Sequence, residues 1–173
     1  MKMFATSVLV AGAFMATAAS ASAPAINDAQ IASIVVTANQ VDIDAGKLAA
    51  SKASSAEVKA FGRQMATDHA GVNKQATDLA AKLNVTPEDN PTSESLKKGG
   101  DDNLKNLRSL KGPAFDKAYI DHEVAYHQAV LDAVDKTLIP NAKNEELKAL
   151  LVKVRPAFVA HLEHARHVQA SLK

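Results

Sequence analysis

The chain has 173 residues, with 20 lysines and arginines against 19 aspartates and glutamates, six histidines and no cysteine. This balance of charge excludes bulk attraction to nucleic acid or to an anionic membrane, so we expect no nucleic-acid partner. The lack of cysteine excludes disulfides, thiolate chemistry and a lipid-anchored N-terminal cysteine.

The first residues are typical of a secretory signal peptide. Lys2 gives a short positive start, the run 4–18 is almost entirely apolar or small, and small residues fill 18–23. We expect cleavage after residue 21, or as late as 23, with residues 22–173 forming a single domain. The apolar run is too short to span a bilayer, and no second run follows it. The mature chain should therefore have no transmembrane segment and should lie outside the cytoplasm, in the periplasm.

Seven-residue apolar spacing predicts two long helices in the first half of the mature chain. The first is expected from Asn27 or Asp28, which can cap it, to about residue 53. The second should follow at once, because Ser54 and Glu57 match a capping box. With so short a link the two helices should be antiparallel neighbours. The residues of this apolar seam are Ile34, Val41, Leu48, Val58, Met65, Val72 and Leu79.

Residues 84–112 are predicted to be a long polar connection. The Gly99-Gly100 pair indicates a break in it, after which one short helix can begin at Asp101 or Asp102. Such a connection suits a crossover between two pairs of helices.

Two more amphipathic helices are expected, the third from residue 112 to about 139 and the fourth from Asn144 onward. Pro156 lies inside the fourth helix and should kink or break it, because proline removes one backbone hydrogen bond and clashes with the preceding turn. The predicted fold is therefore an all-α, up-and-down four-helix bundle with a long crossover between helices two and three.

Three of the six histidines, His69, His127 and His161, interrupt the apolar stripes of these helices. A buried polar group without a partner costs about 1–3 kcal/mol, so each histidine needs one in the core. One interpretation is a polar layer of hydrogen-bonded histidines. The other is a metal site with the ligands His69, His127, His161, Asp42 and Asp68. Imidazole and carboxylate ligands together suit a divalent zinc, iron, copper or nickel ion.

Two observations weigh against a single, ferritin-type oxidase site. Di-iron carboxylate bundles carry Glu-x-x-His on two helices, and this motif does not occur in the sequence. From a turn centred on Asn141, His127 is 14 residues back and His161 is 20 forward. Their levels should then differ by roughly 9 Å at 1.5 Å per residue, which leaves Glu123 as an alternative partner of His161.

These residues resemble the bacterial domain of unknown function (DUF) 4142 family over nearly all of the mature chain. The matching pattern is Asp42 with Gly46-Lys47-Leu48-Ala49, Val58-Lys59-x-Phe61 with Met65-x-x-Asp68-His69, Phe115-Asp116-x-x-Tyr119 with His127, and Pro156 followed by His161-Leu162. The resemblance implies an exported protein with a ferritin-like bundle, in which Asp68-His69, His127 and His161 are the marked polar positions. The family's frequent outer-membrane label has no support in this sequence, and the family has no established activity.

Three hypotheses follow. The first is an exported, non-enzymatic bundle that binds a metal ion or small ligand through its polar core, in storage, buffering or stress response. The second is a structural or protein-interaction module whose histidines are core polar contacts. The third is a ferritin-like redox metalloenzyme, which the missing Glu-x-x-His motif disfavours.

Overall fold

A computed structural model of the chain describes residues 26–172, and every regular element in that range is helical. The elements are α1 (Asp28–Lys52), α2 (Ala56–Lys82), α3 (Pro91–Ser109), α4 (Gly112–Ala133), the π-helical turn η1 (Val134–Leu138), α5 (Ile139–Asn141) and α6 (Glu145–Ser171). The all-α prediction is confirmed for this range. The predicted signal peptide at 1–21 lies outside the described residues.

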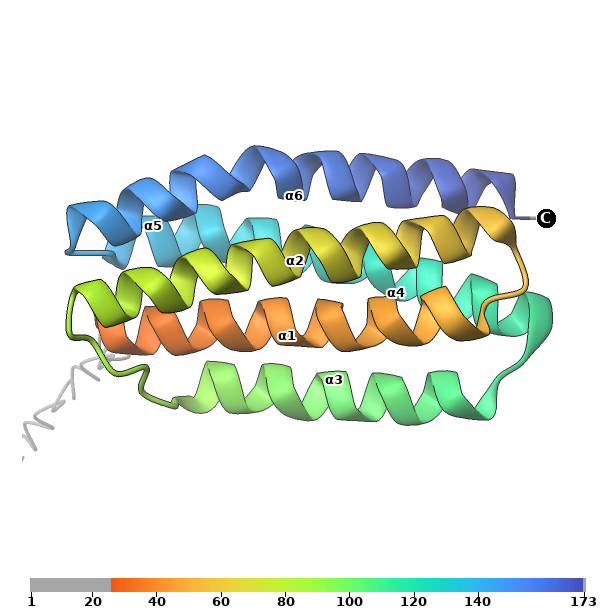
Figure 1. The fold of residues 1–173 in the computed structure, drawn as a ribbon, viewed down its shortest axis with the longest axis horizontal. Coiled ribbons are helices and arrows are strands. Elements are labelled where there is room, and N and C mark those ends of the chain that lie inside the picture. Colours follow the sequence, from red (N-terminus) through yellow and green to blue (C-terminus); the bar gives the residue numbers. More distant parts are fainter. Residues whose placement is uncertain (1–25, 173) are drawn as a thin grey trace, which may run out of the picture.

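The long helices run side by side along the long axis of the molecule (Figure 1). In this view α1 lies between α2 and α3, α6 lies above α2, and α4 runs behind them and packs against α6. No helix among residues 26–172 is both long enough and apolar enough to cross a membrane.

Helices α1 and α2 approach each other closely because two glycines face one another. A Cβ atom on Gly46 would lie 2.7 Å from the carbonyl oxygen of Gly62, and one on Gly62 would lie 2.8 Å from that of Gly46. Any larger side chain would push the two backbones apart. The predicted antiparallel pairing of these two helices is confirmed, and Asn27 caps α1 as expected.

The turn between α1 and α2 differs in detail from the prediction. The N-cap of α2 is Ser55, whose side chain accepts from Val58 N, and not Ser54. Ser54 instead donates its hydroxyl to Asp116 of α4. The same carboxylate accepts from the backbone amides of Ser54, at 2.9 Å, and Ser55, at 2.8 Å. Asp116 therefore fastens the turn to the neighbouring helix.

The predicted polar crossover is wrong in one respect, because most of it is the 19-residue helix α3. Asn90 caps this helix in place of Asp101 or Asp102. Its side-chain oxygen accepts from the backbone amides of Thr92 and Ser93. Gly100 lies inside the helix and does not break it. A Cβ atom there would lie 2.7 Å from Val41 Cγ2, so the glycine lets α3 pack against α1.

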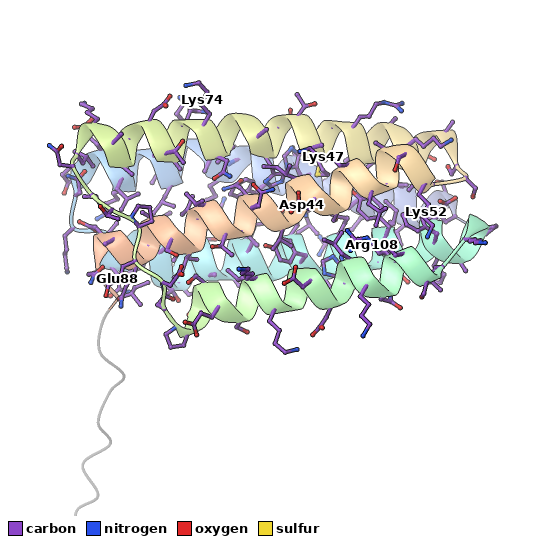
Figure 2. All side chains as sticks on the ribbon, turned by 60° about the horizontal axis from the view of Figure 1, so that its bottom comes forward. Asp44, Lys47, Lys52, Lys74, Glu88 and Arg108 are labelled. Atoms are coloured by element: carbon purple, nitrogen blue, oxygen red, sulfur yellow. The ribbon has the colours of Figure 1, made fainter. Side chains whose placement is uncertain are left out.

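At the other end of α3, the side chain of Lys52 from α1 donates to two backbone carbonyl oxygens, those of Leu107, at 3.1 Å, and Arg108. Figure 2 labels both Lys52 and Arg108 near this junction. Because α3 ends in unsatisfied carbonyl groups, a lysine there both pairs them and complements the helix dipole.

The helical run that begins with α4 continues beyond the end predicted for the third helix. It passes through η1 and α5, which contains Pro140, and ends at Asn141. Asn144 caps α6 as predicted, accepting from the amides of Glu146 and Leu147. Pro156 does not break α6, which is assigned as one helix. The helix changes direction near its middle in Figure 1, as expected of a tolerated proline.

The core has an apolar cluster towards each end and a polar layer between them. The first cluster contains Phe61, Met65 and Phe115, and the second contains Ile31, Leu138 and Leu151. The buried polar residues of the layer, each at most 3% exposed, are Asn39, Asp42, His69, Glu123, His127 and His161. Polar side chains so deeply buried need hydrogen-bond partners or a bound ion to offset their lost hydration.

Candidate metal centre

Side chains from α1, α2, α4 and α6 converge in the polar layer. One ring nitrogen from each of His69, His127 and His161 lies within 4.8 Å of the other two. Ligand atoms of Asp42, Glu123 and His127 meet the same limit, so the two groups share His127. Each helix of this set therefore contributes at least one residue to a single buried cluster.

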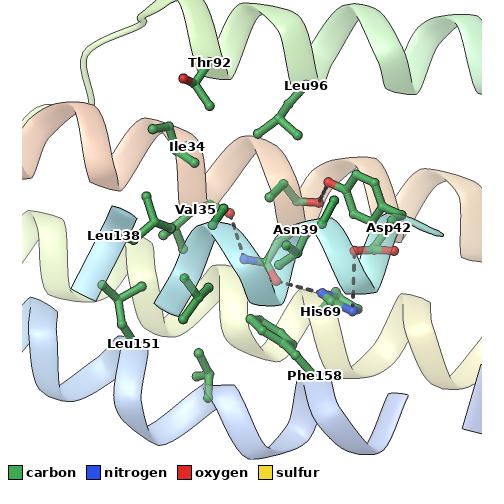
Figure 3. A pocket seen from close by; sticks show the side chains of 17 residues that line it. Ile34, Val35, Asn39, Asp42, His69, Thr92, Leu96, Leu138, Leu151 and Phe158 are labelled. Carbon is green, nitrogen blue, oxygen red and sulfur yellow. Dashed lines mark hydrogen bonds and ion pairs between the residues drawn. The ribbon is translucent and has the colours of Figure 1, made fainter. Parts of the chain in front are cut away.

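The proton position on His69 is set by Asn39. His69 Nδ1 lies 2.8 Å from Asn39 Oδ1, and Asn39 Nδ2 donates to the carbonyl oxygen of Val35 at 2.8 Å (Figure 3). Since that second bond requires the amide nitrogen, the oxygen must face His69. His69 Nδ1 therefore carries the proton and donates it, and Nε2 presents a lone pair to the cluster.

His127 has the same arrangement. Its Nδ1 lies 3.1 Å from the backbone carbonyl oxygen of Glu123, which can only accept. The Nε2 of His127 then also presents a lone pair, and it lies 3.3 Å from Nε2 of His69. Two acceptor atoms at this distance repel each other unless a cation lies between them, either a proton or a metal ion.

A proton is the less favourable of these two cations. Burial, with a further contribution from the neighbouring histidines, lowers the pKa of His69 to about 2. Burial and His161 lower the pKa of His127 to about 4. At neutral pH both rings are therefore neutral. Two nitrogens 3.3 Å apart, each about 2.1 Å from a zinc ion, would subtend roughly 100° at the metal, close to a tetrahedral angle.

His161 brings a third nitrogen. Its Nε2 lies 3.0 Å from Asp68 Oδ2, while its buried Nδ1 has no hydrogen-bond partner among the described residues. Asp68 is 43% exposed at its side chain, on the outer side of the ring. A metal-binding histidine commonly donates its second nitrogen to a carboxylate in this way, which fixes the ring and raises its basicity.

Two carboxyl groups complete the cluster. Asp42 Oδ2 lies 3.6 Å from His69 Nε2, and Glu123 Oε2 lies 3.4 Å from His127 Nδ1. Within the described residues, both Glu123 oxygens and Asp42 Oδ1 lack a hydrogen-bond partner, as does the hydroxyl of Tyr119. Burial raises the pKa of Asp42 to about 8 and holds that of Glu123 well above its usual range, where the charge of Asp42 adds to the effect.

The arrangement combines three imidazole nitrogens with carboxylate oxygens in a dry core. This donor set suits zinc, copper, iron or nickel and does not suit calcium or magnesium, which prefer oxygen ligands alone. A bound cation would also allow the two carboxyl groups to ionise, since an adjacent positive charge favours the carboxylate form.

A comparison with known protein families identifies the family of this chain. The model of a domain of unknown function, DUF4142, matches residues 13–168. The chain belongs to the DUF4142 family. No curated protein and no solved structure matches it. Membership of DUF4142 assigns no activity, and the whole candidate centre lies inside the matched region.

The structure brings together four of the five predicted site residues of this DUF4142 chain: His69, His127, His161 and Asp42. It places Asp68 against His161, outside the groups that could share one ion. The alternative pairing of His161 with Glu123 is not seen, because Glu123 lies beside His127.

The expected difference in level between His127 and His161 is wrong. Their ring centroids lie 5.5 Å apart. The turn runs over 142–144, so His127 is 15 residues before Ala142 and His161 is 17 after Asn144, a difference of about 3 Å at 1.5 Å per residue. The wider π-helical turn η1 further alters the register.

Two residues of the centre are absent from the predicted site. Asn39 lies in the apolar stripe of α1, three residues before Asp42, and this spacing was available as a signal. Glu123 lies four residues before His127, which puts both side chains on one face of α4.

Proposed function

We propose that this DUF4142 protein binds one divalent first-row transition-metal ion in its core. The ligands are His69 Nε2, His127 Nε2, His161 Nδ1 and the Asp42 carboxylate. Glu123 lies beside this set and either adds a further oxygen ligand or balances the charge of the ion. Asn39 and Asp68 hold the rings of His69 and His161 in the binding orientation.

One observation carries the proposal: the two Nε2 lone pairs that face each other at 3.3 Å. Their second nitrogens are held by acceptors, at 2.8 Å for His69 and 3.1 Å for His127. A purely structural polar layer would orient one of the two rings as a donor, so that the pair forms a hydrogen bond. The tautomers assigned from the contacts of His69 with Asn39 and of His127 with the Glu123 carbonyl leave no donor between the two rings, which supports a shared cation.

We further propose that α1, α2, α4 and α6 form a ferritin-like four-helix bundle, with α3 as a helical crossover. The paired, side-by-side arrangement of these helices supports this topology. The N-terminal sequence supports export to the periplasm, where the protein would store or buffer its metal. The absence of Glu-x-x-His from the sequence supports a binding role over ferritin-type oxidase chemistry.

The test is metal binding to residues 22–173, purified without affinity tags that bind metal and stripped with a chelator. Equilibrium dialysis against Zn²⁺, Cu²⁺ or Co²⁺, followed by elemental analysis, should give one ion per chain. Mg²⁺ and Ca²⁺ should not bind. Bound metal should also raise the melting temperature, because the ion binds only the folded protein.

Matched variants locate the ion. His127→Leu should lose stoichiometric binding, whereas His167→Leu should keep it, since His167 is exposed and outside the cluster. Circular dichroism at 222 nm checks that both variants remain helical. Equal metal content in the two variants, or no binding by the parent protein, would reject the proposal in favour of a structural polar layer.

A further inference from the structure

Beside the polar layer lies an apolar cavity of about 150 Å³, which the metal centre does not explain. Its walls come from α1, α3, α4, η1 and α6, with His69 of α2 at one end, and Figure 3 shows them from close by. Leu138 and Leu151 line its inner part, and Phe158 lies at the end nearest His69. The cavity therefore connects the apolar cluster of one end of the bundle with the edge of the candidate metal centre.

The outer part of the cavity lies between α3 and α4. Thr92 and Leu96 of α3 and Ala129 and Ala133 of α4 line it, and Thr92 and Ala129 are exposed. Two alanines on one face of α4 leave the space that larger side chains would fill. A small molecule can thus reach the cavity from the surface without unfolding the bundle.

The wall beside this space is the π-helical turn η1, which contributes Val134 and Leu138. A π-helical turn inside an α-helix is rare, because its hydrogen-bond geometry is poorer than that of the α-helix. Those that do occur are frequently found at functional sites. Here the turn falls where the chain lines the cavity, so the irregular backbone and the empty space coincide.

The polar groups at the inner end of the cavity have almost no free hydrogen-bonding atom to offer a ligand. Asn39 uses its amide nitrogen on Val35 and its oxygen on His69. The ring of His69 stacks on Phe158, with centroids 5.4 Å apart and planes 7° apart. Of the described residues that line the cavity, Asp42 is the one with a buried oxygen that lacks a partner, and its carboxyl group belongs to the proposed metal site. A charged or strongly polar molecule would lose its hydration here without compensation.

We propose that this cavity binds a small, uncharged, apolar molecule, about the size of benzene, beside His69. An engineered apolar cavity of about 150 Å³ in another protein stays dry and binds benzene or xenon, and the cavity here has the same volume and comparable walls. The proposal goes beyond metal binding and holds for the metal-free protein. When the metal is bound, the apolar molecule lies next to one of its ligands.

The test uses benzene and xenon with the metal-free protein, in which the methyl groups of leucine and valine are labelled with ¹³C for NMR. Both probes should shift the methyl signals of Leu138 and Leu151 saturably. In Ala133→Leu the added side chain fills the outer cavity, and binding should weaken by about tenfold or more. Ala125→Leu is the matched control, because Ala125 is exposed on the same helix and outside the cavity.

A second variant, Leu96→Phe, narrows the cavity from α3 and should also weaken binding, which covers the event that Ala133→Leu fails to fold. Unsaturable shifts in the parent protein, equal affinity in Ala133→Leu, or ordered water filling the cavity would each overturn the proposal. Metal content is measured in parallel. Ala133→Leu should keep its metal, so a failure of apolar binding and a failure of metal binding are separate results.

Discussion

The Nε2 atom of His69 lies 3.3 Å from the Nε2 atom of His127. In both rings the other nitrogen, Nδ1, donates a hydrogen bond to an oxygen atom. The two lone pairs thus face each other in a core where each histidine is at most 2% exposed. A metal ion between the two nitrogens, as proposed above, would resolve this arrangement.

The first prediction concerns Asn39, which fixes the proton of His69 on Nδ1. Asn39→Leu should weaken metal binding by about 10–100-fold, because the ring loses the partner that orients it. A competition titration with a chromophoric chelator measures the change. Asn106→Leu on the exposed face of α3 serves as the control and should leave the affinity unaltered. An unchanged affinity in Asn39→Leu would contradict the assigned tautomer.

The second prediction separates two roles for Asp68. If this carboxylate only holds His161, Asp68→Asn should weaken binding less than His161→Ala does, because the amide oxygen still accepts from Nε2. The side chain is 43% exposed, so water can also replace it. The same titration compares the two variants. Equal losses would instead support Asp68 as a direct ligand, which is one of the candidate roles that the sequence leaves open.

The third prediction is a fall in the stability of the metal-free protein between about pH 6.5 and 8. Asp42 has a folded pKa of about 8 against an ordinary value of 3.8. In that interval the folded state keeps a proton that the unfolded state has lost, so stability decreases as pH rises. The slope is about 1.4 kcal/mol per pH unit for each such group. Urea unfolding at several pH values measures it.

The histidines act in the opposite direction and in a different range. His69 has a folded pKa of about 2 against 6.5, so it makes stability rise with pH only up to about pH 6.5. This opposing contribution fades between about pH 6.5 and 7.5, as the unfolded histidines lose their last protons, and the carboxyl groups then dominate the slope. Asp42→Asn should reduce the decrease between pH 6.5 and 8. Constant or rising stability of the parent protein in this window would contradict the buried, protonated state of Asp42.

Bound metal should reverse this pH dependence. The ligands must lose their protons before they bind, so metal affinity should rise with pH, and binding should release protons. Calorimetry in two buffers of different ionisation enthalpy counts the protons released at pH 7. Binding without proton release would argue against Asp42 as a ligand.

The fourth prediction concerns a structural contact away from the site. Asp116 is 2% exposed and accepts from both backbone amides of the turn at Ser54 and Ser55 and from the Ser54 hydroxyl. Asp116→Ala should lower the free energy of unfolding by about 2–4 kcal/mol, because the turn keeps buried donors without an acceptor. Metal content per folded chain should not change. A loss below 1 kcal/mol in urea unfolding would contradict this role.

The apolar stripes were enough to predict α1, α2, α4 and α6, because the residues on the buried face of a helix recur every three to four positions in the sequence. They revealed only the C-terminal half of α3, where Leu107 is fully buried, because Gly100, which packs against α1, was taken as a break. Glycine favours breaks in a sequence pattern, yet at a close helix contact it is the residue that fits. Such a contact becomes visible only when both helices are placed.

The site was predicted in part for a related reason. His69, His127 and His161 replace apolar residues in their stripes, so their burial follows from the pattern alone. Their levels depend on turn lengths and on η1, and a difference of a few residues in the turn moves a side chain by several ångströms. The spacing of Asn39 to Asp42 and of Glu123 to His127 could have indicated both residues, but the contact of Asn39 with His69 on another helix does not follow from that spacing.

The most direct test of the central claim is a crystal structure of the zinc-loaded protein, with diffraction data collected on both sides of the zinc absorption edge. One anomalous peak is expected in the core, about 2.1 Å from Nε2 of both His69 and His127 and within bonding distance of His161 Nδ1. A core without a peak, with zinc found only at surface groups such as His164 and His167, would contradict it.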